Sequence, residues 1–225
     1  MEAEFWHERW RQNEIGFHQD TVNPWLEHLI EGRRKDNDPA CPPRVFVPLC
    51  GKSRDMLWLA DNGFDVVGVE VSQIAVEDFF RESALQPAVE QVAGHTHYVT
   101  DNIRLICGDY FALESEETGL ITDVFDRASL IALPTEMRRR YTMKMAALLT
   151  PGSTMLLVTL DYPQHEMDGP PFAVGQAEIE QLYGAAFDTE VLDSRDLLDE
   201  EQRFRERGLT RLTETAYKLT KTRES

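Results

Sequence analysis

Short apolar runs alternate with amphipathic stretches between Arg44 and Leu160, and this rhythm organises the middle of the chain. Apolar runs of about four to eight residues are typical of buried strands, whereas apolar positions at helical spacing are typical of helices. Strands that alternate with helices form βαβ units, and such units wind a parallel sheet. The pattern therefore predicts an α/β fold, with a mostly parallel twisted sheet and helices on both of its faces.

Five strands are predicted from the apolar runs, at residues 44–49, 65–71, 102–107, 122–126 and 153–160. Helices are predicted at residues 53–62, 72–82, 135–149 and 176–186. Ser53 and Ser72 are predicted N-caps, because a serine hydroxyl accepts from the unpaired amides of a first helical turn. Right-handed crossovers then place the carboxyl ends of the strands along one edge of the sheet, where such folds bind their ligands.

The two ends of the chain depart from this rhythm. Residues 2–12 predict an aromatic amphipathic helix, and residues 1–30 as a whole are expected to form a helical lid. Alternation over residues 209–220 predicts a terminal antiparallel strand at or near the sheet edge. Pro-rich loops are expected at residues 36–43 and 163–172. All 225 residues are expected to form a single domain, because each half alone would have a thin core.

The charge balance narrows the choice of partners. The chain carries 40 acidic and 23 basic residues, and its net charge of -17 repels the phosphates of nucleic acids and of anionic membranes. No apolar run approaches the ~18 residues that span a bilayer, and the acidic start from Met1 to Glu4 lacks the positive charge of a signal peptide. We therefore expect a cytoplasmic protein without nucleic-acid or membrane partners, and the acidic surface favours a monomer.

The spacing of cysteines and histidines gives no metal or disulfide motif. Cys41, Cys50 and Cys107 lie far apart and form no C-x-x-C pair, so reduced thiols are expected. For Cys50, a small buried residue after a strand is favoured over a nucleophile. His95-x-His97 falls in a predicted connector without acidic or cysteine neighbours, and no metal site is expected there.

The turn between the first strand and the first helix, residues 48–53, lies where doubly wound folds receive a nucleotide. A P-loop is strongly disfavoured, because Phe46 stands where its first glycine is required. The dinucleotide fingerprint G-x-G-x-x-G is also absent, since Gly51 is the only glycine of the turn. S-adenosylmethionine has no pyrophosphate, so one glycine suffices for it, with the peptide groups of Leu49 and Gly51 facing its amino acid moiety. A plain strand-to-helix turn explains the segment equally well.

Glu70 ends the second predicted strand, about 20 residues after Gly51, which is the spacing of an acid that binds ribose hydroxyls. A carboxylate accepts hydrogen bonds from both hydroxyls of one ribose. Its charge is costly inside a valine-rich strand and is expected at the mouth of that strand. The ribose interpretation is favoured over a surface glutamate.

Two further strand ends carry charged side chains. After the third strand, Asp109 or the backbone beside it is suited to the adenine amino group, and a plain turn explains Gly108-Asp109 equally well. After the fourth strand, Arg127 is suited to clamp a cofactor carboxylate or an anionic acceptor with two hydrogen bonds. An ion pair between Arg127 and Asp126 is the alternative.

Aromatic side chains near the N-terminus are candidates for a cover over the bound cofactor. Trp6, Trp10 and Phe17 suit this role, because a sulfonium cation is attracted to the face of an aromatic ring. Core packing of the N-terminal helix explains the two tryptophans nearly as well. His18 follows Phe17, and no catalytic role is assigned to it.

Several short stretches together resemble the thiopurine S-methyltransferase family, over almost the whole chain. They are Phe5-Trp6 through Trp10, Gly16-Phe17-His18-Gln19, VFVPLCGK at 45–52, VGVE at 67–70, FDR at 125–127 and GPPF at 169–172. Their order and spacing argue against coincidence, and the acidic composition is similar to that of bacterial members.

The resemblance implies the Rossmann-like fold of S-adenosylmethionine-dependent methyltransferases, with S-adenosylmethionine as the cofactor. It implies cofactor contacts at four matching positions, which are Trp10, Leu49, Glu70 and Arg127. Phe17 matches an aromatic residue near the acceptor, and Arg203 resembles a family arginine that lines the acceptor pocket. On its own, Arg203 fits a solvated helical face.

The acceptors implied by the resemblance are thiopurines and other small aromatic thiols and, for bacterial relatives, selenium and tellurium compounds. The implied reaction is a direct displacement at the methyl group, without a covalent enzyme intermediate and without an assigned general base. Two other classes stay open on the residues alone. A Rossmann-type oxidoreductase would need the absent pyrophosphate glycines, and a non-catalytic cofactor-binding protein would keep the fold without turnover.

Overall fold

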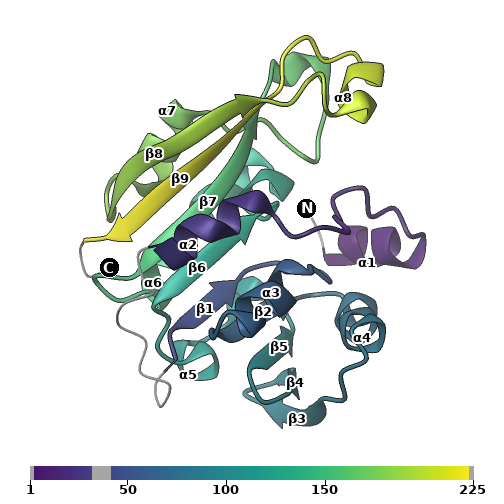
Figure 1. Cartoon of the computed structure of the whole chain (residues 1–225), viewed down its shortest axis with the longest axis vertical. Helices are drawn as coiled ribbons and strands as arrows, with labels where there is room; N and C mark the ends of the chain where they lie inside the picture. Colours follow the sequence, from purple (N-terminus) through teal and green to yellow (C-terminus); the bar gives the residue numbers. More distant parts are fainter. Residues whose placement is uncertain (1–2, 32–41, 223–225) are drawn as a thin grey trace. The chain divides into compact units, whose positions relative to one another are not determined.

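The computed structural model describes residues 3–31 and 42–222 (Figure 1). Cys41 and most of the Pro-rich segment expected at residues 36–43 lie outside the described residues. The chain divides into two compact units, Met1–Phe125 and Asp126–Ser225. The single domain expected from the length of the chain stays a prediction.

The first unit begins with α1 (Ala3–Arg11), the 3-10 helix η1 (Pro24–Leu26) and α2 (Glu27–Glu31). The remaining elements follow in the order β1 (Arg44–Val47), α3 (Asp55–Asp61), β2 (Asp65–Glu70), α4 (Gln73–Glu82), β3 (Ala88–Val92), β4 (His95–Val99), β5 (Ile103–Cys107), η2 (Tyr110–Ala112), α5 (Ser115–Thr118) and β6 (Asp123–Arg127). The last two residues of β6 belong to the second unit. The four strands and three helices predicted between residues 2 and 126 are confirmed, with bounds that differ by a residue or two.

The parallel part of the sheet is built from the predicted strands. β1 pairs in parallel with both β2 and β6, and β2 pairs in parallel with β5. Every residue of β2 after Asp65 is buried, which is typical of a strand covered on both faces. Helices α3 and α4 pack against β2. The predicted α/β class, with a parallel core, is confirmed.

A hairpin that the sequence did not predict extends this sheet. β3 pairs antiparallel with β4, and β4 pairs antiparallel with β5. All residues of β3 are exposed, and β4 begins with polar residues, so neither strand shows the apolar run that marks a buried strand. The connector expected around His95-x-His97 is therefore wrong, because both histidines lie in β4.

The second unit consists of η3 (Leu130–Ala132), α6 (Thr135–Leu148), β7 (Thr154–Asp161), η4 (Gln164–Glu166), α7 (Gln176–Tyr183), β8 (Phe187–Asp196), α8 (Gln202–Glu206) and β9 (Thr213–Lys221). β9 pairs antiparallel with both β7 and β8. The antiparallel terminal strand is confirmed, and it lies one strand in from the edge because β8 forms the edge. β8 was not predicted, since most of its residues are polar and are not buried.

The two predicted N-caps differ from the observed helix starts. Ser53 is not an N-cap, because α3 begins after Arg54, although Ser53 Oγ accepts from the Asp55 amide at 3.3 Å. Ser72 is the N-cap residue of α4, but its buried hydroxyl forms no hydrogen bond. The backbone amide of Ser72 donates to Glu70 Oε1 at 2.8 Å. The carboxylate of Glu70, and not the serine hydroxyl, therefore accepts a hydrogen bond from an amide at the start of α4.

The loop after β7, residues 163–172, is fastened along its length. Gln164 Oε1 accepts from the Ala173 amide at 2.9 Å, and Gln164 Nε2 donates to Met167 O at 2.6 Å. The Tyr162 hydroxyl donates to Pro171 O at 2.6 Å. Tyr162 and Met167 also belong to an apolar cluster, whose other members are Leu197, Phe204, Leu209 and Leu212. The loop is therefore held at its ends and in its middle.

Arg138 joins α6 to α7 inside the second unit. The residue is 2% exposed, and its Nη1 lies 2.7 Å and 2.8 Å from the two carboxylate oxygens of Glu178. The same guanidinium donates to Leu133 O at 2.8 Å and to Ala173 O at 3.3 Å. A buried charge is tolerated when it is paired and hydrogen-bonded in this way.

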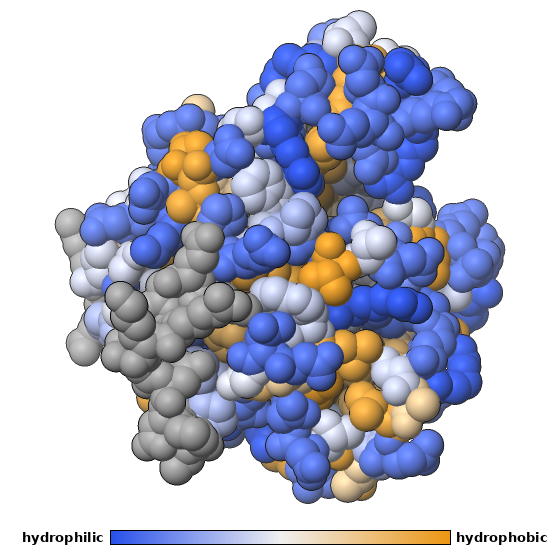
Figure 2. Space-filling view, in the orientation of Figure 1, coloured by the Kyte–Doolittle hydropathy of each residue, from blue (hydrophilic) through white to orange (hydrophobic). Residues whose placement is uncertain are grey.

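The surface is consistent with the charged composition. Figure 2 shows hydrophilic side chains over most of the face in view, with smaller apolar areas between them. Charged residues make up 28% of the chain. Within the part of the chain that the structure describes, no helix is both long and apolar enough to cross a bilayer.

Replacement of Arg138 by methionine is expected to destabilise the protein by about 3 kcal/mol, because Glu178 and two carbonyls lose their donor. Chemical denaturation measures this loss. Arg139→Met is the matched control, since Arg139 is the exposed neighbour on the same helix and should change stability by less than about 0.5 kcal/mol. Equal stability of the two variants would contradict the structural role of Arg138.

Candidate cofactor site

The turn that joins β1 to α3 has a left-handed backbone at two positions. Leu49 has a φ of 43° and Gly51 a φ of 52°. Glycine adopts this conformation freely, whereas Leu49 adopts it at a steric cost of about 1 kcal/mol. The Cys50 amide donates to Val69 O at 2.9 Å, which ties the turn to the neighbouring strand. The two residues predicted to face the amino acid moiety of the cofactor thus lie beside the end of β2.

Trp10 lies directly against this turn. A Cβ added at Gly51 would be 3.1 Å from Cζ2 of Trp10, which is closer than ordinary contact. Trp10 is 6% exposed, and its ring meets Phe17 edge-on with the centroids 5.7 Å apart. Phe17 also meets Trp6 edge-on, at 5.9 Å. The three predicted aromatic residues therefore form one cluster at the turn, and their contact with a sulfonium stays a prediction.

Glu70 places a buried carboxylate at the same point. The residue is 6% exposed, at the end of β2 where the sequence predicted it. Its Oε2 accepts from the Gly51 amide at 3.0 Å, and its Oε1 accepts from the Ser72 amide at 2.8 Å. A carboxylate offers about four acceptor positions, so Glu70 keeps acceptor capacity beyond its backbone partners.

The environment of Glu70 alters its protonation. Burial raises the pKa of Glu70 to about 7, and the amides of Ser72, Gly51 and Val71 limit the rise by hydrogen bonding to the ionised form. Donation from two ribose hydroxyls would favour the ionised form further. Glu70 is thus a buried acceptor, and it lies beside Gly51, whose missing Cβ leaves room for the Trp10 ring. This arrangement fits an adenosyl group.

Asp109 follows β5, as the sequence predicted. The residue is exposed, and its Oδ1 accepts from the Phe111 amide at 2.9 Å, which caps η2. This hydrogen bond accounts for Asp109 as a turn residue. Contact between Asp109 and an adenine stays a prediction.

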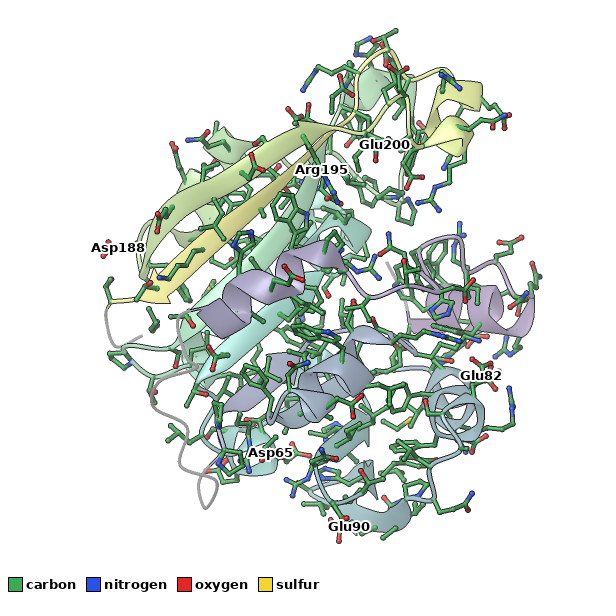
Figure 3. The ribbon with its side chains drawn as sticks, viewed as in Figure 1. Asp65, Glu82, Glu90, Asp188, Arg195 and Glu200 are labelled. Carbon is green, nitrogen blue, oxygen red and sulfur yellow. The ribbon has the colours of Figure 1, made fainter. Side chains whose placement is uncertain are left out.

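Cys50 and Lys52 are accounted for by their surroundings. Burial, with the nearby Glu70 carboxylate, raises the pKa of Cys50 well above its usual value, so the thiol stays neutral. The prediction of a small buried residue is confirmed for Cys50. Lys52 Nζ lies 2.7 Å from Oε1 of Glu82, near the end of α4 (Figure 3). Neither side chain therefore resembles a reactive or phosphate-binding group.

Asp126 and Arg127 end β6 and belong to the second unit. Asp126 is fully buried, and its Oδ2 accepts from the Tyr141 hydroxyl at 2.7 Å. Burial raises the pKa of Asp126 to about 6, against the effect of this hydrogen bond. Arg127 is half-buried. Binding of Arg127 to a cofactor carboxylate or to an anionic acceptor stays a prediction, as does the alternative ion pair with Asp126.

Arg203 lies on α8 of the second unit. Its Nε is 2.9 Å from Glu201 Oε2, and its guanidinium lies over the ring of Phe204 at 4.8 Å. Arg203 is exposed. These contacts agree with a solvated helical face, and the acceptor role implied by the family resemblance stays a prediction.

The sequence did not single out Glu117 of α5, a carboxylate that is 2% exposed. Its Oε1 is 2.7 Å from His95 Nδ1 and 3.4 Å from His97 Nε2. The expectation that these histidines lack an acidic partner is therefore wrong, because the partner is distant only along the chain. In the described ranges, no group of three or more histidine, cysteine, aspartate and glutamate side chains could hold a metal ion.

Comparison with protein families matches residues 1–222 to the family described as Thiopurine S-methyltransferase (TPMT). A Thiopurine S-methyltransferase of Pseudomonas fluorescens is 47% identical over 221 residues, which is 98% of this chain and 98% of the relative. The Thiopurine S-methyltransferase of Bordetella parapertussis is 46% identical over 219 residues, or 97% of this chain and 98% of the relative.

The fold is also found in solved methyltransferases. The crystal structure of Burkholderia thailandensis 1,6-didemethyltoxoflavin-N1-methyltransferase, with bound S-adenosylhomocysteine, matches with a TM-score of 0.63 at 15% identity. The match covers 98% of this chain and 87% of that chain. This likeness confirms the methyltransferase fold, and the match to the family over nearly the whole sequence shows that the chain belongs to the thiopurine S-methyltransferase family.

Proposed function

We propose that the methyl acceptor of this chain is the sulfur of a thiopurine or of another small aromatic thiol, with selenium and tellurium compounds as further acceptors. Methyl transfer from S-adenosylmethionine follows from membership of the family. One observation carries the proposed acceptor, namely the family match over residues 1–222, which extends through both units. Relatives of nearly the same length carry the same family name at 46–47% identity.

The residues of the first unit supply the binding groups for the cofactor. In this proposal Glu70 accepts from the two ribose hydroxyls, and Asp109 or its neighbouring backbone reads the adenine. The turn with Leu49 and Gly51 faces the amino acid moiety, and Trp10 covers the site. S-adenosylmethionine, when bound, supplies an electrophilic methyl group. The protein's task is to orient the two reactants and to exclude water.

The acceptor needs little help from acid or base groups. An aromatic thiol that is already ionised is a competent nucleophile, and a nearby guanidinium lowers the pKa of such a thiol further. Arg127 and Arg203 are the proposed sources of this positive charge. No side chain is assigned as a general base, since the nucleophile arrives without a proton to remove.

The two thiols that the structure describes, Cys50 and Cys107, are poor competitors for the methyl group. Burial, together with Glu70, raises the pKa of Cys107 to about 11 and holds the Cys50 thiol neutral as well. A neutral thiol is far less nucleophilic than a thiolate. Burial first, and the Glu70 carboxylate second, therefore disfavour methylation of these two thiols.

Radiolabelled methyl transfer to a panel of aromatic thiols tests the proposed acceptor. S-adenosylmethionine that carries a labelled methyl group should give labelled thioethers with 6-mercaptopurine and thiophenols, and inorganic selenite should be tested in parallel under reducing conditions. Phenols of the same shape serve as the control, because an oxygen nucleophile is weaker. Cofactor binding without transfer to any thiol would contradict the acceptor class and would favour a non-catalytic binding protein.

The affinity for S-adenosylhomocysteine is expected to fall as the pH drops below about 7, because Glu70 then takes up a proton and loses acceptor strength. For a single proton the loss approaches about tenfold per pH unit. Calorimetry from about pH 6 to about pH 8 measures this slope. Glu70→Gln should flatten the slope and weaken binding at the upper end by ~1.5–3 kcal/mol.

The control for Glu70 is Glu90→Gln, because Glu90 is an exposed glutamate on β3 (Figure 3) and should leave the profile unchanged. A steep profile that persists in the Glu70→Gln variant would assign the titration to another group. It would remove Glu70 from the ribose site.

Arg127→Ala is expected to lower kcat/KM for methyl transfer by about tenfold or more, since a charged hydrogen bond is worth ~1.5–3 kcal/mol. Arg127→Lys should recover only part of the loss, because an ammonium group cannot form the two-pronged contact. Steady-state kinetics of thiol methylation provide the comparison, with Arg139→Ala as the exposed control. Unchanged kinetics in folded Arg127→Ala would place this arginine outside the site.

A further inference from the structure

The ring of His95 lies over Gly108, the residue directly before Asp109. Thr96 of β4 pairs with Cys107 of β5, so His95 comes opposite Gly108 at the next position. A Cβ added at Gly108 would overlap Cδ2 of His95 and would lie 2.9 Å from both Cγ and Nε2 of the ring. Gly108 does not have a positive φ. The backbone therefore does not require a glycine at this position, but the histidine ring does.

Glu117 holds the His95 ring in place through a hydrogen bond. A carboxylate only accepts hydrogen bonds, so His95 Nδ1 carries the hydrogen that it donates over 2.7 Å to Glu117 Oε1. The Glu114 amide donates to the second oxygen, Oε2, at 3.0 Å. Burial raises the pKa of Glu117, but the hydrogen bonds from His95 and Glu114 bring it below its usual value. Glu117 is therefore ionised, and hydrogen bonds to an ionised acceptor are the stronger kind.

His97 provides a natural comparison on the same strand. It contacts the same carboxylate oxygen, at a longer distance of 3.4 Å, and it is 1% exposed. Its partner across the sheet is Ile106, which lies inside β5, and not the turn that follows this strand. His95, in contrast, lies against Gly108 in the turn that carries Asp109.

The turn after β5 is also connected to the proposed ribose acid. The Gly108 amide donates to the backbone oxygen of Glu70 at 2.9 Å. Gly108 is therefore fixed from one side by the end of β2 and is covered on another by the His95 ring. The next residue, Asp109, is exposed and is stabilised by its own contact to the Phe111 amide.

We infer that His95 is a positioning residue, which fixes the Gly108-Asp109 turn so that the turn can read the adenine amino group, and that Glu117 in turn fixes His95. The inference rests on the proposed function, because it takes the turn after β5 as the adenine site. It adds a hydrogen-bonded pair, His95 on β4 and Glu117 on α5, to the groups that determine cofactor selectivity.

The test compares two nucleosides that differ at one group. S-adenosylhomocysteine carries the adenine amino group, and S-inosylhomocysteine carries an oxygen in its place. The wild-type protein should prefer the adenosyl compound in calorimetry. His95→Gln keeps a donor for Glu117 but removes the ring, and it should weaken binding of the adenosyl compound by roughly two- to tenfold. Binding of the inosyl compound should change little.

His165→Gln is the control, because His165 is an exposed histidine on η4, away in sequence from His95 and Glu117, and it should leave both affinities as they are. An equal loss for the two nucleosides in His95→Gln would overturn the inference, since that result describes a general structural defect. The same selective loss in His165→Gln would overturn it as well. Failure of the wild-type protein to bind S-adenosylhomocysteine at all would instead refute the proposed function itself.

Gly108→Ala gives an independent route to the same contact. The added methyl group displaces the His95 ring while Asp109 stays in the sequence, so the same selective loss for the adenosyl compound is expected. In a His95→Ala background the substitution should add little, because the two changes disrupt one contact and residues in contact are not additive. Fully additive losses would show that the two residues act separately and would overturn the inference.

Discussion

The buried side chain of Glu70 connects the segments that form the candidate cofactor site. The two carboxylate oxygens of Glu70 accept from the turn after β1 and from the start of α4. The backbone oxygen of the same residue accepts from the turn after β5. Removing such a group from water is costly, and the cost is visible in its raised pKa. Glu70 bears this cost where the ends of three neighbouring strands come together.

The parallel strands could be predicted from the sequence because they are buried on both faces. A strand such as β2, with consecutive valines, produces a continuous apolar run that is typical of a fully buried strand. The antiparallel strands β3 and β8 produced no such signal, since they lie at the ends of their pairings and most of their residues stay in contact with water. Apolar patterning reports burial, and it finds exposed edge strands poorly.

The candidate site residues also differ in how far the sequence could predict them. Glu70 and Gly51 were identified because strand ends and turns can be located from local patterns. A cover by Trp10 was proposed only from chemistry and family resemblance, and its contact with Gly51 was not predicted, because nothing local joins residues so far apart. A role for Glu117 could not be predicted, because its partners lie 20 and 22 residues away in a strand that was not predicted. Pairing between distant residues is what a single sequence does not encode in any short pattern.

The loop at residues 163–172 is anchored by Gln164, by the Tyr162 hydroxyl and by an apolar cluster. A loop with these contacts is expected to keep one backbone conformation and not to open and close. If it takes part in the choice of acceptor, new substrate preferences would arise by exchanging the side chains that it displays. Its backbone path would be retained, so closely related enzymes could diverge in chemistry while their loops superimpose.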